Sequence, residues 1–266
     1  MNISDMTAGM WCWRRPRYLR RTLESWAKVD GVHDLRGITI ALEPSERKDE
    51  MLAVIEDART RHGLNITVRH NSQQLGVLVN PVVSGSAILN EDPGAKFLIA
   101  MDEDMDLSDD LLWYMTWAAT RFEDDPSVFC VCSHSVSGAG PDADQGAVQL
   151  AQRFHVWVWG TWRDRWFDVA VPTWDRDYSS GDPSSGIPSG YDWNLDLRIL
   201  LQRNLRCVLP VASRSQDIGQ FEGVHASPAD FRRTQDPSFR AHRGKVEYRM
   251  VDAVACTGTL PSSRPN

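Results

Sequence analysis

Met-Asp-Glu-Asp-Met-Asp-Leu-Ser-Asp-Asp-Leu, residues 101–111, places six carboxylates within eleven residues. The run follows directly on Ala-Lys-Phe-Leu-Ile-Ala, residues 95–100, whose length suits a buried strand and is too short for a core helix. Asp102, Glu103, Asp104 and Asp106 therefore cluster at the carboxyl end of a strand, where open α/β sheets bind their ligands. Because so many negative charges repel one another, we expect a hard divalent cation with oxygen ligands to compensate them.

The residues before this run alternate between strand and helix patterns. Strands are predicted at residues 37–42, 64–69 and 96–101, and helices at 17–28, 49–61 and 75–89, where Pro81 marks a helix start or a kink. Residues 9–16 are predicted to form the loop where a first strand meets its helix. This alternation is typical of βαβ units and a mostly parallel sheet.

The pattern continues after the acidic run. Ser108 is predicted to cap a helix whose first turn holds Asp109 and Asp110, with a buried stripe from Leu111 to Phe122. Further elements are expected as a strand at 127–133, a mobile loop at 175–190, a helix at 191–202, a last strand at 206–211 and a disordered tail at 262–266. We expect two halves, residues 1–133 and 134–266, within one compact domain.

Composition narrows the class of protein. The 266 residues are 42% hydrophobic and 24% charged, which is typical of a soluble globular protein, and no apolar run is long enough to span a membrane. The N-terminus lacks the regions of a signal peptide, and the five cysteines are irregularly spaced, so we expect reduced thiols and a cytoplasmic location. The net charge of −7 argues against a large nucleic-acid footprint.

The acidic run is not a calcium loop of the EF-hand type. Asp102, Asp104 and Asp106 match its opening spacing, but Leu107 stands where glycine is needed and Trp113 where a bidentate glutamate is needed. The remaining alternative is a solvated acidic turn without a ligand, which the position at the end of a strand makes the weaker interpretation.

Residues 97–115 resemble the metal-binding segment of GT-A glycosyltransferases, in particular the N-acetylglucosaminyltransferase I family and related bacterial and phage proteins. The resemblance implies an α/β domain with a GT-A-like, Rossmann-type mixed sheet, mostly parallel and flanked by helices. It also implies a DXD-type motif in which Asp104 binds Mn²⁺ or Mg²⁺, while Asp102 and Glu103 lie near the ribose and the sugar of a nucleotide-sugar donor. The order Asp-Glu-Asp differs from the more usual Glu-Asp-Asp, so the division of roles between Asp102 and Asp104 stays open.

Three later stretches resemble the same family in the same order. Residues 157–166, rich in tryptophan, correspond to a segment of the donor and acceptor pocket, with Trp159 and Gly160 as binding residues. Gly-Tyr-Asp-Trp-Asn, residues 190–194, corresponds to the motif of the catalytic base, here Asp192. Residues 213–219 and 223–225 correspond to a segment that folds over the nucleotide, with Arg214 near the donor and His225 at the diphosphate or the metal.

Two early segments complete the expected donor site. In the loop at residues 9–16 the resemblance implies contact with the nucleoside by Trp11 and with phosphate by Arg14 or Arg15. Glu43, at the end of the second predicted strand, is placed to accept hydrogen bonds from a base or ribose.

These residues predict a metal-dependent glycosyltransferase of the hexosyltransferase type, which transfers a sugar from a nucleotide-sugar, foremost a UDP-sugar, to an acceptor hydroxyl with inversion. The acceptor stays open between a glycan, a small molecule and a hydroxymethylated base in DNA, the last suggested by basic residues at 231–245. Two alternatives remain: a nucleotidyltransferase, although residues 9–11 do not form the expected Gly-rich loop, and a carbohydrate-binding protein without catalysis, which the eleven tryptophans alone would favour.

Overall fold

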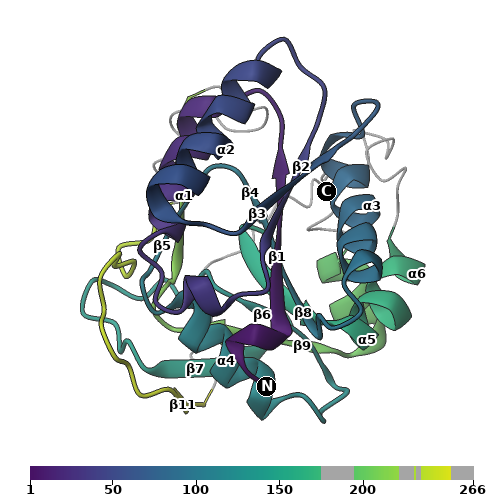
Figure 1. The fold of residues 1–266 in the computed structure, drawn as a ribbon. Coiled ribbons are helices and arrows are strands. Elements are labelled where there is room, and N and C mark those ends of the chain that lie inside the picture. Colours follow the sequence, from purple (N-terminus) through teal and green to yellow (C-terminus); the bar gives the residue numbers. More distant parts are fainter. Residues whose placement is uncertain (175–194, 222–230, 232–234, 253–266) are drawn as a thin grey trace, which may run out of the picture.

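The computed structural model describes residues 1–174, 195–221, 231 and 235–252. Its main element is a nine-stranded mixed sheet, with a second sheet of two strands beside it. The strands are β1 (Met6–Cys12), β2 (Ile38–Leu42), β3 (Ile66–His70), β4 (Phe97–Asp102), β5 (Met105–Leu107), β6 (Val128–Cys132), β7 (Ala147–Ala151), β8 (Val158–Trp162), β9 (Arg206–Pro210), β10 (Ser215–Asp217) and β11 (Arg249–Met250). The large sheet has the order β11-β7-β9-β6-β8-β4-β1-β2-β3 (Figure 1). In the small sheet β10 pairs with β5.

Helices cover both faces of the large sheet. They are α1 (Pro16–Trp26), α2 (Lys48–His62), α3 (Gly76–Glu91), α4 (Leu111–Arg121), α5 (Arg163–Arg165), α6 (Val171–Thr173), the short 3₁₀ turns η1 (Ile3–Asp5) and η2 (Val32–Asp34), and the π-helical segments η3 (Trp166–Ala170) and η6 (Leu195–Leu201). The apolar sides of α1, α2 and α4 form one core cluster with the sheet, whereas α3, η3 and η6 form a second cluster on the opposite face (Figure 1). The α/β class, the helix-flanked mixed sheet and the single compact domain are thus confirmed.

The direction of the strands creates a switch point in the sheet. β1 pairs in parallel with β2 on one side and with β4 on the other, and β2 pairs in parallel with β3. The chain therefore adds its second and third strands on one side of β1 and its fourth strand on the other. In such sheets the loops at the carboxyl ends of the two central strands separate and leave a crevice for a ligand. Here the switch point lies at the carboxyl ends of β1 and β4.

Beyond β4 the sheet is mixed. β8 runs antiparallel between β4 and β6, and β7 runs antiparallel to β9. Gly160 in β8 is required by packing, because a Cβ there would lie 2.1 Å from the ring of Phe97 on β4. Strands from both predicted halves of the chain join this one sheet, and the division at residue 133 stays a prediction.

Most predicted elements are confirmed within a few residues, including the strand before the acidic run. The loop expected at residues 9–16 is wrong in part, because Gly9–Cys12 belong to β1. All seven residues of β1 are buried, so the strand lacks the alternation of polar and apolar residues by which strands are recognised. Pro81 lies inside α3 and does not mark its start.

The start of α4 also differs from the prediction. Asp110 is the N-cap residue, and it makes no side-chain capping bond. The hydroxyl of Ser108, predicted to cap this helix, instead donates to the carbonyl of Arg240. The predicted loop at 175–190, the first part of the helix at 191–202 and the tail at 262–266 lie outside the described residues. Among the described helices, none combines the length and the apolar character that crossing a membrane requires.

Candidate active site

The acidic triplet, residues 102–104, lies at the switch point between β1 and β4. Asp102 is the last residue of β4 and is in register with Trp11 near the end of β1. The side chain of Glu103 is 5% exposed and that of Asp104 is 13% exposed, so both carboxylates are largely withdrawn from water. The sequence prediction that these three carboxylates lie at the carboxyl end of a strand is confirmed.

The turn that carries the triplet is held by α1. The hydroxyl of Thr22 donates to the carbonyl of Glu103 at 2.7 Å and accepts the N–H of Met105 at 2.9 Å. Ser25, one turn later, accepts the N–H of Leu107 at 2.7 Å. These bonds fix the backbone of the turn independently of its acidic side chains.

Among the described residues, one guanidinium contacts the triplet. Arg15, the residue before α1, places Nε 2.8 Å from Oε1 of Glu103 and Nη1 2.7 Å from Oδ2 of Asp104. Arg14, predicted to contact phosphate, lies elsewhere: it is exposed, and its guanidinium stacks on the ring of Trp13 at 4.0 Å. Of the two arginines considered from the sequence, Arg15 is therefore the one that faces the acidic cluster.

A fourth carboxylate, not singled out from the sequence, joins the site from β10. The N–H of Ile218 donates to the carbonyl of Asp104 at 2.9 Å, and the N–H of Gly219 donates to Oδ1 of Asp217 at 2.7 Å. A Cβ on Gly219 would lie 2.4 Å from Oδ2 of Asp104 and 3.0 Å from Oδ1 of Asp217. Glycine is therefore needed where the backbone after β10 closes against the acidic cluster of residues 102–104 and 217.

The electrostatics of this acidic cluster favour a bound cation. Withdrawal from water raises the pKa of Asp102 well above its ordinary value, and the charges of Asp104 and Glu103 raise it further. The pKa of Asp104 is raised to about 7, again chiefly by burial, although Arg15 opposes the shift. Burial also raises the pKa of Asp217. One arginine does not compensate four neighbouring carboxylates, and a divalent cation would restore their ordinary ionisation.

The donor set suits a hard cation that is completed by its ligand. Every side chain in the acidic cluster offers carboxylate oxygen, which Mg²⁺ and Mn²⁺ prefer. These oxygens do not converge as a closed cage: among the described residues, three ligand atoms lie within 4.8 Å of one another only at Cys130, Cys132 and Cys207. Ions of this class commonly bind through one or two carboxylates together with substrate phosphates and water. The acidic cluster fits that mode of binding.

The three cysteines form a different kind of cluster. Sγ of Cys130 lies 3.1 Å from Sγ of Cys207 and 3.9 Å from that of Cys132, and all three residues are fully buried. Two thiolates on one tetrahedral zinc ion would be about 3.8 Å apart, given Zn–S bonds near 2.3 Å. The short Cys130–Cys207 spacing and the apolar surroundings instead describe thiols packed in the core between β6 and β9.

Glu43, predicted to accept hydrogen bonds from a base or ribose, accepts hydrogen bonds from the protein backbone in this structure. Its Oε1 accepts the N–H groups of Leu75 at 3.1 Å and Gly76 at 2.8 Å. Gly76 has φ +74°, a conformation that glycine adopts without strain. Glu43 therefore ties the end of β2 to the start of α3, and burial raises its pKa.

Three of the predicted donor-binding residues lie in the core. Trp11 is 5% exposed and belongs to the second core cluster, on the α3 face. Trp159 is fully buried and packs against Phe129, Phe154 and Trp166. Gly160 is the packing glycine of β8 described above. Trp11 is the register neighbour of Asp102, but its side chain belongs to the core cluster, as does that of Trp159. The tryptophans were predicted to bind the donor because the sequence around them is rich in aromatic residues. Large aromatic side chains, however, pack in a hydrophobic core as readily as they form a binding surface.

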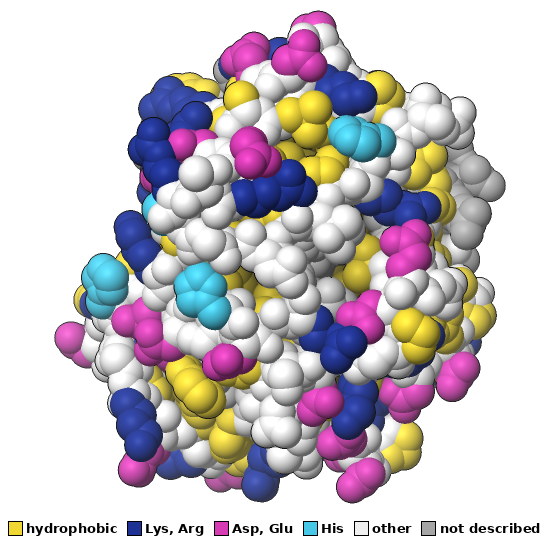
Figure 2. Space-filling view, viewed as in Figure 1, with side chains coloured by type: hydrophobic (Ala, Val, Ile, Leu, Met, Phe, Trp, Pro, Cys, Tyr) yellow, Lys and Arg dark blue, Asp and Glu magenta, His cyan; other side chains and the backbone are white. Residues whose placement is uncertain are grey.

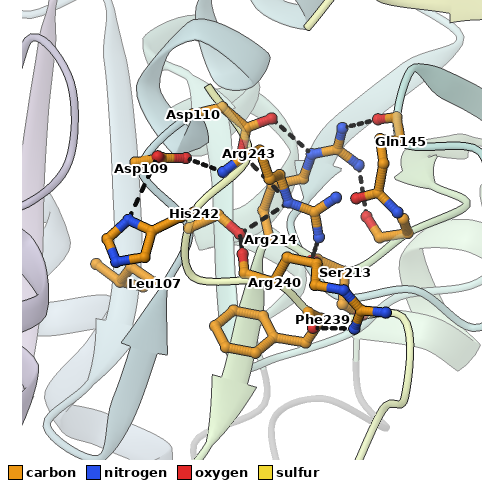
Figure 3. Close-up of polar contacts among 12 residues, drawn as sticks. Leu107, Asp109, Asp110, Gln145, Ser213, Arg214, Phe239, Arg240, His242 and Arg243 are labelled. Carbon is orange, nitrogen blue, oxygen red and sulfur yellow. Dashed lines mark hydrogen bonds and ion pairs between the residues drawn. The ribbon is translucent and has the colours of Figure 1, made fainter. Parts of the chain in front are cut away.

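Arg214 belongs to a network of ion pairs with Asp110 and Arg243 (Figure 3), which the hydroxyl of Tyr248 joins through a hydrogen bond. The Nε atoms of Arg214 and Arg243 lie 3.4 and 3.6 Å from the carboxylate of Asp110, and the hydroxyl of Tyr248 donates to it at 3.0 Å. The carbonyl of Arg214 also accepts the N–H of Ser108 at 2.9 Å. This network fastens the start of α4 to the residues before β10, and so holds Asp217 near the triplet.

Asp192 and His225 lie outside the described residues, so their predicted roles stay predictions. Within the described part of the basic segment suggested as a DNA contact, the side chain of Arg243 is withdrawn from solvent, whereas Arg240, His242 and Lys245 are exposed. Arg240 donates to the carbonyls of Pro141 and Pro237, and the side chain of Arg243 is 1% exposed. Basic and acidic side chains are interspersed on the face of the molecule drawn in Figure 2.

No protein-family model matches this chain. Among solved structures it resembles the mannosyltransferase PcManGT from Pyrobaculum calidifontis, solved with GDP-Man and Mn²⁺, at a TM-score of 0.50 and 14% identity over 77% of this chain and 54% of that one. A weaker likeness, with a TM-score of 0.38 and 18% identity over 51% of this chain and 36% of that one, is to S. aureus TarS 1–349 in complex with UDP. The chain thus spans about half the length of PcManGT. The likeness to PcManGT shows that this protein has a GT-A-like glycosyltransferase fold.

Proposed function

We propose that this protein is a metal-dependent glycosyltransferase that moves a sugar from a nucleotide-sugar to an acceptor hydroxyl. The observation that carries the proposal is the cluster of four carboxylates with a single arginine at the switch point of a GT-A-like sheet. A solvated acidic turn would not be expected to withdraw these groups from water or to raise the pKa of Asp104 to about 7.

Asp104 is the proposed metal-binding residue, with Asp102 and Asp217 as neighbouring oxygen donors and His225 as a further candidate ligand. Mn²⁺ or Mg²⁺ at this position would act as a Lewis acid that stabilises the leaving diphosphate. Arg15, whose planar guanidinium suits bidentate contact with phosphate, lies at the same position. The structural neighbour PcManGT was solved with GDP-Man and Mn²⁺, which agrees with this class of ligand. A UDP-sugar is the proposed donor.

The proposed reaction is a single displacement with inversion. An acceptor hydroxyl oxygen forms a bond to the anomeric carbon while the bond from that carbon to the diphosphate oxygen breaks. Asp192 is the proposed general base, and its carboxylate takes the proton of the hydroxyl. The nucleoside diphosphate leaves with the electron pair of the broken bond. Thr22, which bonds the carbonyl of Glu103 and the N–H of Met105, keeps the backbone of the triplet oriented during this step.

The acceptor is proposed only as a hydroxyl-bearing molecule. The burial of the Arg243 side chain removes one of the cations on which a DNA acceptor would depend. A glycan or small-molecule acceptor does not require a row of basic side chains of this kind.

The proposal is tested by incubating the protein with a panel of uridine- and guanosine-linked sugars, with and without Mn²⁺. We expect release of nucleoside diphosphate from at least one donor, which requires the metal and is lost on addition of a chelator. Slow hydrolysis of the donor would reveal activity even without the natural acceptor. Release of inorganic pyrophosphate from nucleoside triphosphates would indicate a nucleotidyltransferase instead. Sugar binding without any turnover would indicate a carbohydrate-binding protein.

A further inference from the structure

The contacts of Arg15 occupy the same oxygen that the proposed metal needs. Its Nη1 lies 2.7 Å from Oδ2 of Asp104, while Nε holds Glu103 at 2.8 Å. Building on the proposed function, we infer that Arg15 is an internal counter-cation that competes with the metal for Asp104 and is released to the diphosphate of the donor. Metal and nucleotide would then bind cooperatively, each favouring the other through Arg15.

The charges of the acidic cluster explain why a guanidinium sits there. Asp102, Glu103, Asp104 and Asp217 act on one another, and among the described residues Arg15 is the cation that acts on all four. Without any cation, these partly buried carboxylates would repel one another strongly. A divalent ion placed beside Asp104 would in turn repel the guanidinium. The site therefore accommodates Arg15 or the metal at this oxygen, but not both at hydrogen-bond distance.

The position of Arg15 in the chain allows its side chain to move while its backbone stays fixed. Its carbonyl accepts the N–H of Leu19 at 3.1 Å, which anchors the residue to the first turn of α1, and Pro16 follows it directly. The side chain is 17% exposed, so the guanidinium reaches solvent on one side. Its carbon atom Cζ lies 5.8 Å from the ring centroid of Tyr18, so the guanidinium can form a cation–π contact when it leaves Asp104.

The triplet itself does not depend on Arg15 for its backbone conformation. Thr22 bonds the carbonyl of Glu103 and the N–H of Met105, and the N–H of Ile218 bonds the carbonyl of Asp104. Displacing the guanidinium would therefore leave the carboxylates in place. A diphosphate offers pairs of oxygens that can accept two N–H bonds from a planar guanidinium, so the donor supplies the compensating partner.

The test measures Mn²⁺ binding by electron paramagnetic resonance in the absence of nucleotide. For Arg15→Gln we expect Mn²⁺ to bind about tenfold more tightly than to the wild-type protein, within the range usual for coupling between two ligands. Arg15→Lys, which keeps the positive charge, should remain close to the wild type. The matched control is Arg21→Gln in α1, because Arg21 pairs with Asp106 and not with the triplet. Its Mn²⁺ affinity should not change.

A second measurement uses the wild-type protein alone, so that it does not depend on the folding of a variant. Saturating uridine diphosphate should tighten Mn²⁺ binding at least about fivefold, and Mn²⁺ should tighten nucleotide binding by the same factor. In Arg15→Gln this coupling should shrink. Weaker or unchanged Mn²⁺ binding in Arg15→Gln, or independent binding of metal and nucleotide to the wild type, would overturn the inference.

The proposed function fails in a different way. If neither the wild type nor Arg15→Gln binds Mn²⁺ with or without nucleotide, the metal site itself is wrong, and the inference falls with it. If the wild type binds Mn²⁺ through Asp104, as a loss in Asp104→Asn would show, and Arg15→Gln does not tighten that binding, only the role of Arg15 is wrong.

Discussion

At the scale of single residues, the proposed metal site depends on Asp104. It combines a largely buried carboxylate, a pKa near 7 and a close contact with the one cation of the acidic cluster. Asp104→Asn keeps the size of the side chain and removes its charge. Replacing a residue that only supports a metal ligand costs up to about 100-fold in metal affinity. Because Asp104 is proposed as a ligand itself, we expect a loss of at least about 100-fold in Mn²⁺ affinity. Isothermal titration with Mn²⁺ measures this. The control is Asp106→Asn, because the carboxylate of Asp106 pairs with the exposed Arg21 and not with the proposed metal. This variant should bind Mn²⁺ as the wild type does.

Asp192 gives a separate test at the same scale. Removing a general base slows transfer by about 10²–10⁴-fold without removing donor contacts. Asp192→Asn should therefore bind metal and nucleotide as the wild type does, while nucleoside diphosphate release falls by that factor. Normal turnover of this variant would show that another group accepts the proton. A joint loss of nucleotide binding would assign Asp192 to the donor site instead.

At the scale of secondary-structure elements, the two-stranded sheet of β5 and β10 brings Asp217 to the triplet. The turn after β10 passes so close to Asp104 that a Cβ at Gly219 would contact its carboxylate at 2.4 Å. Gly219→Ala should therefore displace the tip of Asp104 and weaken Mn²⁺ binding severalfold, with little change in melting temperature because a flexible side chain can yield. Gly140→Ala, where a Cβ would meet nothing within 4 Å, is the matched control. Equal Mn²⁺ affinity in both variants would contradict the closeness of this turn to the metal site.

The elements also show what the sequence could and could not predict. The strand β4 and its acidic triplet were predictable, because an apolar run followed by carboxylates is a local signal. Asp217 and Arg15 were harder to identify, since they reach the triplet through strand pairing and a helix start that are remote in sequence. The buried network of Asp110 and Arg214 could not be predicted for another reason. A carboxylate in the first turn of a helix normally suggests an interaction with the helix dipole rather than a buried ion pair.

The aromatic residues show a second limit of prediction from the sequence. Trp11 and Trp159 are core residues, although their composition is equally typical of a sugar-binding surface. Only the pairing of β8 between β4 and β6 settles which side of the sheet Trp159 occupies and what covers it. Periodicity within a short, fully buried strand does not carry that information.

At the scale of the whole molecule, the raised pKa of Asp104 links stability to pH. Its pKa rises from 3.8 to about 7 on folding, so between these values the folded protein retains a proton that the unfolded chain has lost. Stability must then fall as pH rises across this window. The metal-free protein should melt at a lower temperature at pH 7.5 than at pH 5, by roughly 2–4 °C for each kcal/mol of stability lost. Saturating Mn²⁺ should remove part of this decline, and Asp104→Asn should show a smaller one. A melting temperature that rises over the same range in the metal-free protein would contradict the assignment.

The central claim is that a divalent cation binds at Asp104 and holds a nucleoside diphosphate at the switch point of the sheet. Its most direct test is an anomalous difference map at the manganese edge, from crystals grown with Mn²⁺ and uridine diphosphate. We predict one strong peak within coordination distance of the Asp104 carboxylate and of the diphosphate oxygens, with the guanidinium of Arg15 turned from Asp104 to the phosphate. A peak at another site, or a nucleotide bound away from an Asp104 that still pairs with Arg15, would contradict the account.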